Sequence, residues 1–405
     1  MSRKPAAATE SQDLRIRVIA AMSEIAAADW DRCAGGGEMA GGPNPFTRHA
    51  FLAALETSKS ATARTGWQPQ HLVAESTDGT IIGVVPCYLK SHSRGEYVFD
   101  AGWADAYERA GGSYYPKLQV SVPFTPATGR RLLVAPGQPA RVAEAALAQG
   151  LIALCKLCEA SSVHATFMTQ AEWDLLGQRG FLRRNDQQFH WENGGFSCFE
   201  DFLAALASRK RKVIKRERRE GLADGIKVDW LTGSDLTEAA WDAFFAFYTE
   251  TGSRKWGRPY LTRAFFSRLG ETMADQTVLI MAKRAGRFIA GAINFVGAGT
   301  LFGRHWGAIE HHPFLHFEIC YYQAIEYAIA HKLARVEAGA QGEHKLARGY
   351  LPATTYSAHY IADPGLRRAI DDYLARERAY VEAAGHELRE ASPFRKDVAH
   401  EDAGF

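Results

Sequence analysis

The chain has 405 residues, 46% of them hydrophobic and 23% charged, and a formal net charge of only +2. This composition is typical of folded, soluble proteins and excludes a disordered chain or a fibrous repeat, while the length favours two domains. The small net charge means that binding to nucleic acid or to an anionic membrane would need a local basic patch, because the field of the whole molecule is too weak.

Cysteine usage and the amino terminus bear on where the protein works. The six cysteines are scattered and too few for a disulfide framework, which favours a reducing compartment. Residues 1–12 are small and polar and do not resemble a secretory signal, so we expect a disordered tail. The most apolar stretch, Val142–Cys158, is interrupted by polar residues and is too short to span a bilayer. The sequence therefore predicts a cytoplasmic protein without a transmembrane segment.

The first half of the chain predicts a hairpin, a further strand, a crossover helix and two more strands. Ser76-Thr77-Asp78-Gly79 separates two apolar, β-rich runs and is a hairpin signal. A long amphipathic pattern beyond it indicates the helix. The predicted elements are strands at His71–Glu75, Thr80–Leu89 and Arg131–Val134, a helix at Ala140–Glu159, a strand at Ser162–Met168 and a strand-like run beginning at Gly180.

The second half repeats this order of elements, with Arg284-Ala285-Gly286-Arg287 as its hairpin turn. Such self-similarity indicates an internal duplication, and a strand, a helix and another strand in succession predict a parallel pair with a right-handed crossover. The predicted elements are a helix at Phe199–Glu220, strands at Val278–Lys283, Phe288–Val296 and Leu301–Trp306, a helix at Phe314–Lys332, a strand at Ala334–Ala338 and a strand-like run beginning at Gly349.

A meander of antiparallel strands followed by one crossover resembles the acetyltransferase (GNAT) fold. The predicted fold class is therefore α/β (α+β), with two tandem acetyltransferase-like domains whose mixed sheets are flanked by helices. We expect the boundary near Asn193–Cys198, where Asn193-Gly194-Gly195 interrupts the pattern. The expected domains are residues 13–195 and residues 196–390, the second carrying the candidate site, and residues 391–405 are expected to form a carboxyl-terminal tail.

The densest polar cluster, Glu337–Gly349, directly follows the strand predicted after the second crossover helix. Ligand sites in open α/β sheets favour this position at the carboxyl end of a strand. Its two glycines permit close approach of backbone to a ligand. Glu343 and His344 are candidate catalytic residues, and Gln341, Lys345 and Arg348 are candidate substrate contacts. The alternative is an exposed charged loop that leads into the next strand.

A second polar segment, Gly303–Glu318, lies at a strand end and a helix start, and we expect it to face the same crevice. Acyl transfer to an amine needs a base and also donors that stabilise the tetrahedral oxyanion. Candidates for the base are Glu318, His316 and His305, and Arg304, His305 and Trp306 are candidate substrate contacts. The alternative for each histidine is a structural role.

Neither the histidines nor the cysteines predict a metal site. His311, His312 and His316 could suggest a metal site, but zinc sites usually need ligands at helix spacing with a compensating acidic or cysteine partner, and the two adjacent histidines cannot share a face. Cys155 and Cys158 form a CxxC pattern within a predicted helix, without a second pair, so we expect them in the core.

A strongly basic run, Ser208–Glu220, holds eight Lys or Arg residues in thirteen positions at the end of a predicted helix. Such a segment could hold phosphates of coenzyme A, a nucleotide-linked lipid carrier or transfer RNA. The candidate anion-binding residues are Arg209, Arg211, Lys212 and Lys215. The run contains no aromatic residues for base stacking, and the alternative is a solvated helix face.

Aromatic and small polar residues gather in two segments of the first half, at residues 102–107 and 114–118. They would suit a groove that grips an extended substrate, with Tyr107 and Lys117 as contacts. The alternative is a pair of surface loops that pack on the core.

These segments together resemble a known family over nearly the whole chain. Residues 114–118 and 121–126, His316-Phe317-Glu318 and Glu337–Gly349 are similar to the FemAB-like group, whose members are commonly labelled GNAT-family N-acetyltransferases or peptidoglycan biosynthesis proteins. Two acetyltransferase-like units in one chain also resemble the Fem aminoacyltransferases of peptidoglycan. The resemblance implies a bacterial transferase that uses acyl-CoA or aminoacyl-tRNA as donor and a small molecule or a cell-wall precursor as acceptor.

The acyl donor is the point at which this sequence departs from ordinary acetyltransferases. Those enzymes carry a Gln/Arg-x-x-Gly-x-Gly/Ala loop whose N–H groups meet the coenzyme A pyrophosphate at a helix N-terminus. The equivalent loops here, residues 135–139 and 308–313, lack that pattern. Acetyl-CoA is therefore the less favoured donor, and the Fem branch, which also lacks a strict version, is favoured.

The leading functional prediction is acyl or aminoacyl transfer to an amine by direct attack on an activated ester or thioester. Glu343, His344 or Glu318 would act as base, while Lys345, Arg348 and Arg304 would orient anionic groups of the substrate. One alternative is an acetyl-CoA-dependent N-acetyltransferase. Another is a non-catalytic module that binds cell-wall precursors or nucleic acid through the basic run.

Overall fold

The computed structural model of the chain describes residues 14–35, 43–256, 259–339 and 342–395. The expected tail at residues 1–12 lies outside the described residues, as does the greater part of the expected tail at 391–405. The elements of the first half are β1 (Arg15–Ile19), α1 (Ala27–Ala34), α2 (His49–Thr57), β2 (Trp67–Pro69), β3 (His71–Glu75), β4 (Ile81–Val85), β5 (Cys87–Lys90), α3 (Ala101–Arg109), β6 (Lys117–Val120), β7 (Leu133–Val134), α4 (Ala140–Leu157), β8 (Ser162–Met168), α5 (Gln170–Gln178) and β9 (Leu182–Glu192).

The second half begins with two helices and then builds its own meander of strands. Its elements are α6 (Phe199–Ala205), α7 (Ser208–Gly221), β10 (Lys227–Leu231), α8 (Glu238–Trp256), α9 (Arg263–Thr272), β11 (Thr277–Arg284), β12 (Arg287–Gly297), β13 (Thr300–Ala308), α10 (Leu315–Phe317), a π-helical turn (Glu318–Tyr322), α11 (Gln323–Ala330), β14 (Arg335–Glu337), a 3₁₀ turn (Glu343–Arg348), β15 (Leu351–Ile361) and α12 (Pro364–Glu390).

The strands form two sheets. A small antiparallel sheet has the order β1-β3-β4-β7, and a large mixed sheet has the order β10-β11-β12-β13-β14-β9-β15-β8-β6-β5-β2. Both predicted hairpins are confirmed, because β3 pairs with β4 and β11 pairs with β12 in antiparallel register. The predicted strand Thr80–Leu89 is interrupted at Pro86, where the chain passes from the small sheet to the large one. Proline lacks the N–H that a continuous ladder requires.

Each half contains one parallel pair. In the second half β13 pairs with β14 across the crossover helix, as predicted. In the first half the strand before the helix, β7, pairs antiparallel with β4 in the small sheet, and β8 takes β6 as its parallel partner. The prediction that Arg131–Val134 supplies the parallel partner is therefore wrong. The partner, Lys117–Val120, is a short strand that the sequence analysis treated only as a motif.

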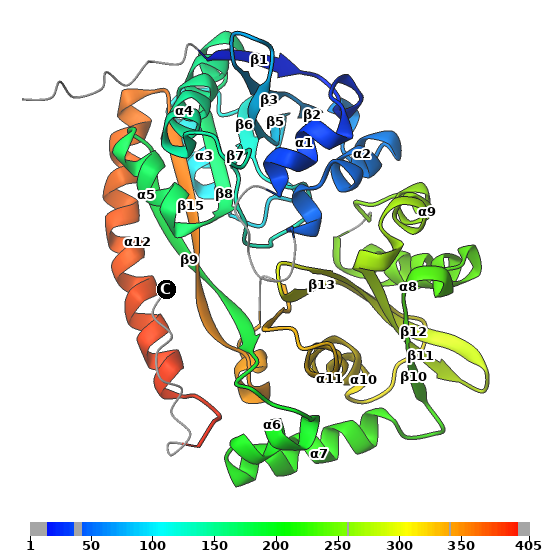
Figure 1. Cartoon of the computed structure of the whole chain (residues 1–405). Helices are drawn as coiled ribbons and strands as arrows, with labels where there is room; N and C mark the ends of the chain where they lie inside the picture. The colour runs from blue at the N-terminus through cyan, green and yellow to red at the C-terminus, as the bar shows by residue number, and fades with distance from the viewer. Residues whose placement is uncertain (1–13, 36–42, 257–258, 340–341, 396–405) are drawn as a thin grey trace, which may run out of the picture.

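The two halves share the large sheet. The long strands β9 and β15 pair with each other, β9 also pairs with β14, and β15 also pairs with β8. They run side by side through the middle of the molecule, with the first half above and the second half below and to the right (Figure 1), and α12 lies along them on the outside. The carboxyl-terminal strand thus adds to the sheet of the first half and ties the halves together.

Two predicted helices are interrupted for identifiable reasons. The helix predicted at Phe199–Glu220 breaks between α6 and α7, where Leu206 forms a β-bridge with Phe394 and the Ala207 N–H donates to the Pro393 carbonyl. The helix predicted at Phe314–Lys332 changes to π geometry over Glu318–Tyr322, which lets the Gln323 amide donate to the Glu318 carboxylate at 2.8 Å. Such π turns occur often at functional sites.

The core consists of separate apolar clusters on the two faces of the sheets. One cluster packs α1 and α2 against α8 and α9 across the boundary between the halves, through residues such as Phe46, Phe51 and Phe265. Others fill the space under α4 and under the α10–α11 region. None of the helices described here is long and apolar enough to cross a membrane.

Candidate functional site

A row of polar side chains crosses the large sheet diagonally on one face. Alternate residues of a strand share a face, and residues paired across neighbouring strands share it too. The registers Gln119↔His164, His164↔His359, Thr166↔Ser357, Thr355↔Asp186 and His190↔Glu337 therefore place these side chains together. We call this row the polar seam; its members are Lys117, Gln119, His164, Thr166, His359, Ser357, Thr355, Arg184, Asp186, Gln188, His190 and Glu337.

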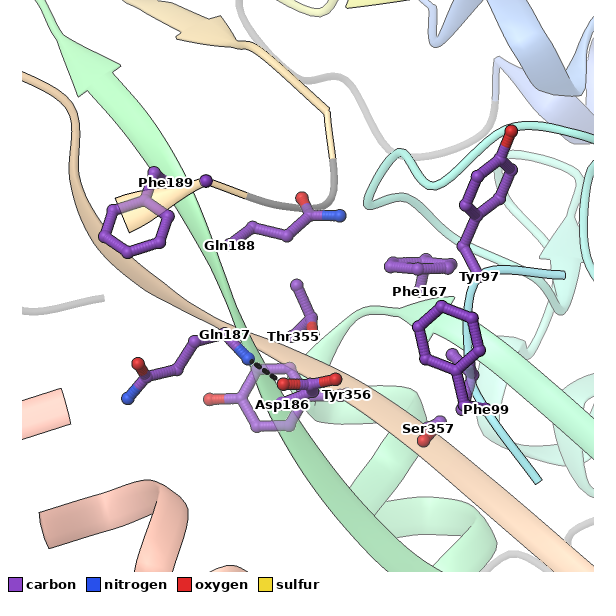
Figure 2. A pocket seen from close by; sticks show the side chains of 12 residues that line it. Tyr97, Phe99, Phe167, Asp186, Gln187, Gln188, Phe189, Thr355, Tyr356 and Ser357 are labelled. Carbon is purple, nitrogen blue, oxygen red and sulfur yellow. Dashed lines mark hydrogen bonds between the residues drawn. The ribbon is translucent and has the colours of Figure 1, made fainter. Parts of the chain in front are cut away.

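The middle of the polar seam forms the floor of a pocket between the two halves, with a volume of about 250 Å³. Asp186, Gln188, Thr355 and Ser357 line it from β9 and β15, and Figure 2 shows the rings of Phe99 and Phe167 across from them. The remaining lining residues are Tyr97, Val98, Gln187, Phe189, Tyr356 and Gly342. We call this space the central pocket.

The backbone around the central pocket is strained at aromatic residues. Tyr97 has φ of 61°, Phe124 has φ of 59° and Phe167 has φ of 55°. Residues other than glycine rarely adopt this left-handed backbone conformation. Each residue held in it raises the free energy of the folded state by about 1–3 kcal/mol. Tyr97 and Phe167 line the pocket, and the Phe124 carbonyl accepts a hydrogen bond from Arg304. Strain of this kind clusters at ligand sites.

At one end of the polar seam stands a buried carboxyl group, Glu337, at the carboxyl end of the parallel pair β13–β14. Burial raises its pKa to about 7, against the opposing effect of Arg335. Its Oε2 atom has no hydrogen-bond partner in the described structure and lies 3.9 Å from His190 Nε2. His190 is held neutral because burial and nearby cations lower its pKa to about 3, and its Nε2–H donates to Gln188 Oε1 at 3.1 Å. The free oxygen of Glu337 is thus left available.

Of the predicted cations, Arg304 interacts with this carboxyl group, and Lys345 interacts with Arg304 and with His190. Lys345 is only 2% exposed, and its ammonium donates to the Gly339 carbonyl at 2.9 Å. Burial, with a smaller contribution from Arg304, lowers the pKa of Lys345 to about 8. Arg304 donates to the Phe124 carbonyl and interacts with the Tyr97 hydroxyl and electrostatically with Glu337. The structure thus brings Arg304 close to both Lys345 and Glu337. The sequence analysis gave Glu337 no role.

The two polar segments of the second half also meet on the other side of the 3₁₀ turn. His344 is exposed, and its Nε2 lies 2.9 Å from the Tyr321 hydroxyl. The Arg348 guanidinium stacks 3.5 Å above the Phe317 ring and forms an ion pair with Glu217 at 2.8 Å. Of the other two candidates in this loop, Gln341 lies outside the described residues, and the structure describes Glu343 only by its backbone, in the 3₁₀ turn.

Glu318 occupies a closed ion pair rather than an open site. Its side chain is 0% exposed and accepts from Arg218 Nη2 at 2.9 Å and from Arg218 Nε at 3.1 Å. Gln323 donates to the same carboxylate. A carboxylate that is fully buried and paired with a guanidinium is closed to a substrate amine, so we no longer propose Glu318 as the base.

The closed pair gives a stability prediction. Glu318→Ala should lower the free energy of unfolding by about 3 kcal/mol, because removing one partner leaves the Arg218 charge partly buried and only half paired. Glu326→Ala is the matched control, since Glu326 binds the same Arg218 at 2.7 Å but is 39% exposed, and it should lose less than about 1 kcal/mol. Urea unfolding followed by circular dichroism measures both, and equal losses would contradict this assignment.

A larger cavity of about 510 Å³ opens at the carboxyl end of β13 and the start of α10. Its walls include Trp306, Phe314, His316 and Phe317, and the rings of Trp306 and His316 are 5.2 Å apart. We call this space the strand-end pocket. Trp306 is therefore a wall residue, whereas His305 faces away, with its ring 5.1 Å from Tyr248 and its pKa lowered to about 3 by burial and Arg304. No group of three or more metal-ligating side chains converges within the described ranges.

A family model for FemAB-like proteins, described as peptidoglycan biosynthesis/recognition, matches residues 21–396. The chain belongs to the FemAB-like family. No curated protein matches it.

Solved structures show the fold of this FemAB-like protein. FemX matches with a TM-score of 0.54 and 11% identity, covering 86% of this chain and 98% of FemX. L-PGS from Bacillus licheniformis matches with a TM-score of 0.50 and 9% identity, covering 84% of this chain and 99% of that one. A tandem GNAT protein from the clavulanic acid biosynthesis pathway matches with a TM-score of 0.43 and 15% identity, covering 87% of this chain and 99% of that one. The predicted tandem acetyltransferase-like fold is confirmed.

Two predicted contacts of the FemAB-like chain lie away from the central pocket. Tyr107 packs in α3 against Gly112 and touches none of the pocket residues named above. Lys117 is fully buried at the far end of the polar seam, where it donates to Glu96 at 2.7 Å and to Asp100. No substrate could reach that ammonium without opening the core, so we drop both residues as proposed contacts.

The basic run forms α7 at the bottom of the molecule in Figure 1. Arg209, Lys212 and Lys215 are exposed and Arg211 is half-buried, and Lys215 forms an ion pair with Glu200 at 2.8 Å. A groove of about 340 Å³ separates α7 from the 3₁₀ turn. The four residues thus form a solvent-facing cationic surface beside the candidate loop.

The sequence analysis missed several residues of the pocket, namely Tyr97, Asp186, Gln188, Thr355 and Ser357. A signal for some of them was present, because polar residues recur along Ser162–Met168 and Leu351–Ile361 and fill residues 183–188 of Leu182–Glu192, although every one of these strands lies inside the sheet. Buried polar side chains on inner strands need partners or a ligand. Tyr97 comes from a loop and carried no such pattern.

Proposed function

We propose that this FemAB-like protein transfers an acyl or aminoacyl group to an amine acceptor, with Glu337 as the base. The observation that carries the proposal is the buried Glu337 carboxyl, with a pKa of about 7 and one oxygen without a partner, at the end of a parallel strand pair between the halves. A base whose pKa lies near the working pH gives the best balance between being deprotonated and being strong enough to accept a proton.

The proposed reaction forms a C–N bond and breaks the C–O or C–S bond of the donor. The acceptor nitrogen gives a proton to Glu337, attacks the acyl carbonyl, and the leaving oxygen or sulfur takes up a proton as it departs. Negative charge develops on the carbonyl oxygen during attack. Arg304, which interacts electrostatically with Glu337, and Lys345, which interacts with Arg304, are the proposed groups that stabilise this charge.

We propose the central pocket for the acceptor and the strand-end pocket for the donor. Both cavities border the 3₁₀ turn, since Gly342, which precedes it, lines the first and Phe317, which stacks on Arg348 of the turn, lines the second. Acceptor and donor would then meet near Glu337. His344 and Arg348 belong to the donor side in this scheme.

The proposed donor is an aminoacyl-tRNA, with acyl-CoA as the alternative. The helix α10, which begins at the strand-end pocket, is preceded by Pro313, which has no N–H, and by its N-cap residue Phe314 at φ of 60°, so a regular set of amides for a pyrophosphate is lacking there. The exposed cations Arg209, Arg211, Lys212 and Lys215 of α7 would meet phosphates of the RNA. The family description favours a cell-wall precursor as acceptor, and we propose a cytoplasmic location.

The proposed base predicts the dependence of the rate on pH. The value of kcat/KM should fall about tenfold per pH unit below pH 7, because protonated Glu337 cannot accept the proton. Rates measured between pH 5 and pH 9 with saturating donor test this. A rate that stays constant down to pH 5 would contradict the assignment.

The transfer itself is tested with two labelled donors. The protein is mixed with a soluble nucleotide-linked peptidoglycan precursor and either tRNA charged with a mixture of labelled amino acids or labelled acetyl-CoA. Label should pass from tRNA to the precursor. Transfer from acetyl-CoA alone would favour the N-acetyltransferase alternative, and transfer from neither donor to this precursor would contradict the proposed acceptor.

A further inference from the structure

Ser357, in the floor of the central pocket, is the end of a buried chain of hydrogen bonds. Its hydroxyl lies 3.0 Å from His359 Nε2, and His359 Nδ1 lies 2.7 Å from His164 Nδ1. His164 Nε2 in turn lies 2.7 Å from the Ser162 hydroxyl and 3.3 Å from the Tyr114 hydroxyl. This chain joins the pocket to the interior of the first half.

The direction of the chain follows from its other end. The Ser161 hydroxyl donates to the Tyr114 carbonyl, which can only accept, so Ser161 must accept from the Ser162 hydroxyl 3.1 Å away. Ser162 has then used its only proton and must accept from His164 Nε2. Each later bond is determined in turn because a neutral imidazole has one donor and one acceptor nitrogen.

The histidines are neutral, so this rule applies to both of them. Burial and the cation Lys117 lower the pKa of His164 to about 3, and burial together with His164 lowers the pKa of His359 well below its usual value. His164 therefore carries its proton on Nε2 and accepts at Nδ1. His359 donates from Nδ1 and accepts at Nε2, and the Ser357 hydroxyl must donate to it.

If every donor and acceptor in this chain were exchanged, some of its contacts would have no proton to form a hydrogen bond. The Tyr114 hydroxyl donates to the Asp100 carboxylate at 2.8 Å, so toward His164 it can only accept. If His164 Nε2 were unprotonated, two lone pairs would face each other there, and the Ser161–Ser162 contact would have no proton. Buried polar groups left unpaired in this way raise the energy by about 1–3 kcal/mol each.

The consequence is that Ser357 offers only its lone pairs to a ligand. Asp186, two residue pairs away along the seam, is the only charged side chain among the described residues that line the central pocket. Although solvent reaches it, the surrounding atoms raise its pKa. Phe99 and Phe167 present aromatic rings on the opposite side (Figure 2). An acceptor oxygen, a carboxylate and aromatic faces together suit an organic ammonium ion.

We infer that the Ser357–Asp186 end of the central pocket is a subsite for an ammonium group of the acceptor, remote from the reacting amine. Asp186 and His190 are four residues apart on β9, which corresponds to about 13 Å. The inference rests on the proposed function only in taking the Glu337 end as the reacting end. The acceptor would then be an elongated molecule whose cationic group lies about 13 Å from its nucleophilic amine.

The hydrogen-bond direction is tested without any ligand. Nitrogen-15 NMR of the full chain, with histidine resonances assigned, distinguishes the two neutral tautomers. We expect His359 protonated at Nδ1 and His164 protonated at Nε2 from pH 6 to pH 8. The reverse tautomers in either ring would overturn the inference.

The subsite is tested with three probes of equal chain length, n-pentylammonium, 1-pentanol and pentanoate, titrated while the His359 Nε2 signal is followed. Pentylammonium should bind at least about tenfold more tightly than pentanol, and Ser357→Ala and Asp186→Asn should each weaken it about tenfold. Asp372→Asn, an exposed residue of α12, is the control of equal charge change and should have no effect. Equal binding of the three probes would overturn the subsite. Because these measurements need no donor, the subsite can be disproved while acyl transfer is still observed, and acyl transfer can be disproved while the subsite still binds pentylammonium.

Discussion

Replacing Glu337 by glutamine is expected to lower kcat/KM for acyl transfer by about 10²- to 10⁴-fold, the range over which a general base contributes. Glutamine keeps the shape of the side chain but cannot accept the proton of the amine. Binding of the acceptor should change little, because the Ser357–Asp186 end of the pocket is untouched. Steady-state kinetics, with the acid limb of the pH profile absent in the variant, measure the effect.

The same variant should not be destabilised at neutral or alkaline pH. Burial raises the pKa of folded Glu337 to about 7, so its contribution to stability is greatest at low pH and is lost as pH rises through 7. Glutamine carries no such loss, and the stability of the variant relative to the wild type should rise by about 2–3 kcal/mol between pH 5 and pH 8.

The control for the rate is Glu192→Gln, since Glu192 lies on the adjacent strand β9 and pairs with Arg335 near the surface. Its rate should stay within about twofold of the wild type, because a surface ion pair contributes little. A Glu337→Gln variant that retains full activity in a folded protein would contradict the assignment of the base.

The second large effect concerns stability. Lys117→Met should lower the free energy of unfolding by about 3–5 kcal/mol, because Lys117 is fully buried and its ammonium neutralises Glu96 and Asp100. Methionine fills a similar volume but leaves two carboxylates with only Lys90, whose Nζ lies 3.7 Å from Glu96. Urea unfolding of both proteins measures the loss.

The deficit of Lys117→Met should shrink at low pH. In the wild type Lys117 outweighs burial and holds the pKa of Asp100 below its usual range, and this stabilisation is lost as pH falls. In the variant, burial raises the pKa of both carboxyls. They are therefore neutral at pH 5, where their burial lowers the stability little, and charged at pH 8, where it lowers the stability more. Lys156→Met, an exposed change on α4, should lose less than about 0.5 kcal/mol at either pH.

The order of elements was predictable because local patterns carried it. Glycine turns with flanking β-rich runs predicted both hairpins, and long amphipathic runs predicted the crossover helices. The predictions that were wrong concerned features that depend on contacts between distant parts of the sequence. The break between α6 and α7 depends on residues near the carboxyl terminus, and the pairing of β6 with β8 joins strands between which β7 and α4 lie in the chain.

The candidate site was predictable in part for the same reason. The polar loop after β14 follows from the strand–helix–strand order, and Arg304 and Lys345 do lie near each other. The other wall of the pocket comes from β9 and β15, which pair across more than 150 residues of sequence. Only that register shows that Asp186, Ser357 and Glu337 belong to one polar seam. The ion pair that closes off Glu318 could not be predicted, because its partner, Arg218, lies in a run that the sequence presented as anion-binding or as a solvated face.

The most direct test of the account is the titration of Glu337 itself. Carbon-13 NMR of the glutamate carboxyl groups, recorded for the wild type and for Glu337→Gln, isolates its signal by difference. We expect a midpoint near pH 7 that coincides with the acid limb of kcat/KM. A midpoint near the ordinary glutamate value of about 4.3 would contradict the assignment of Glu337 as the base.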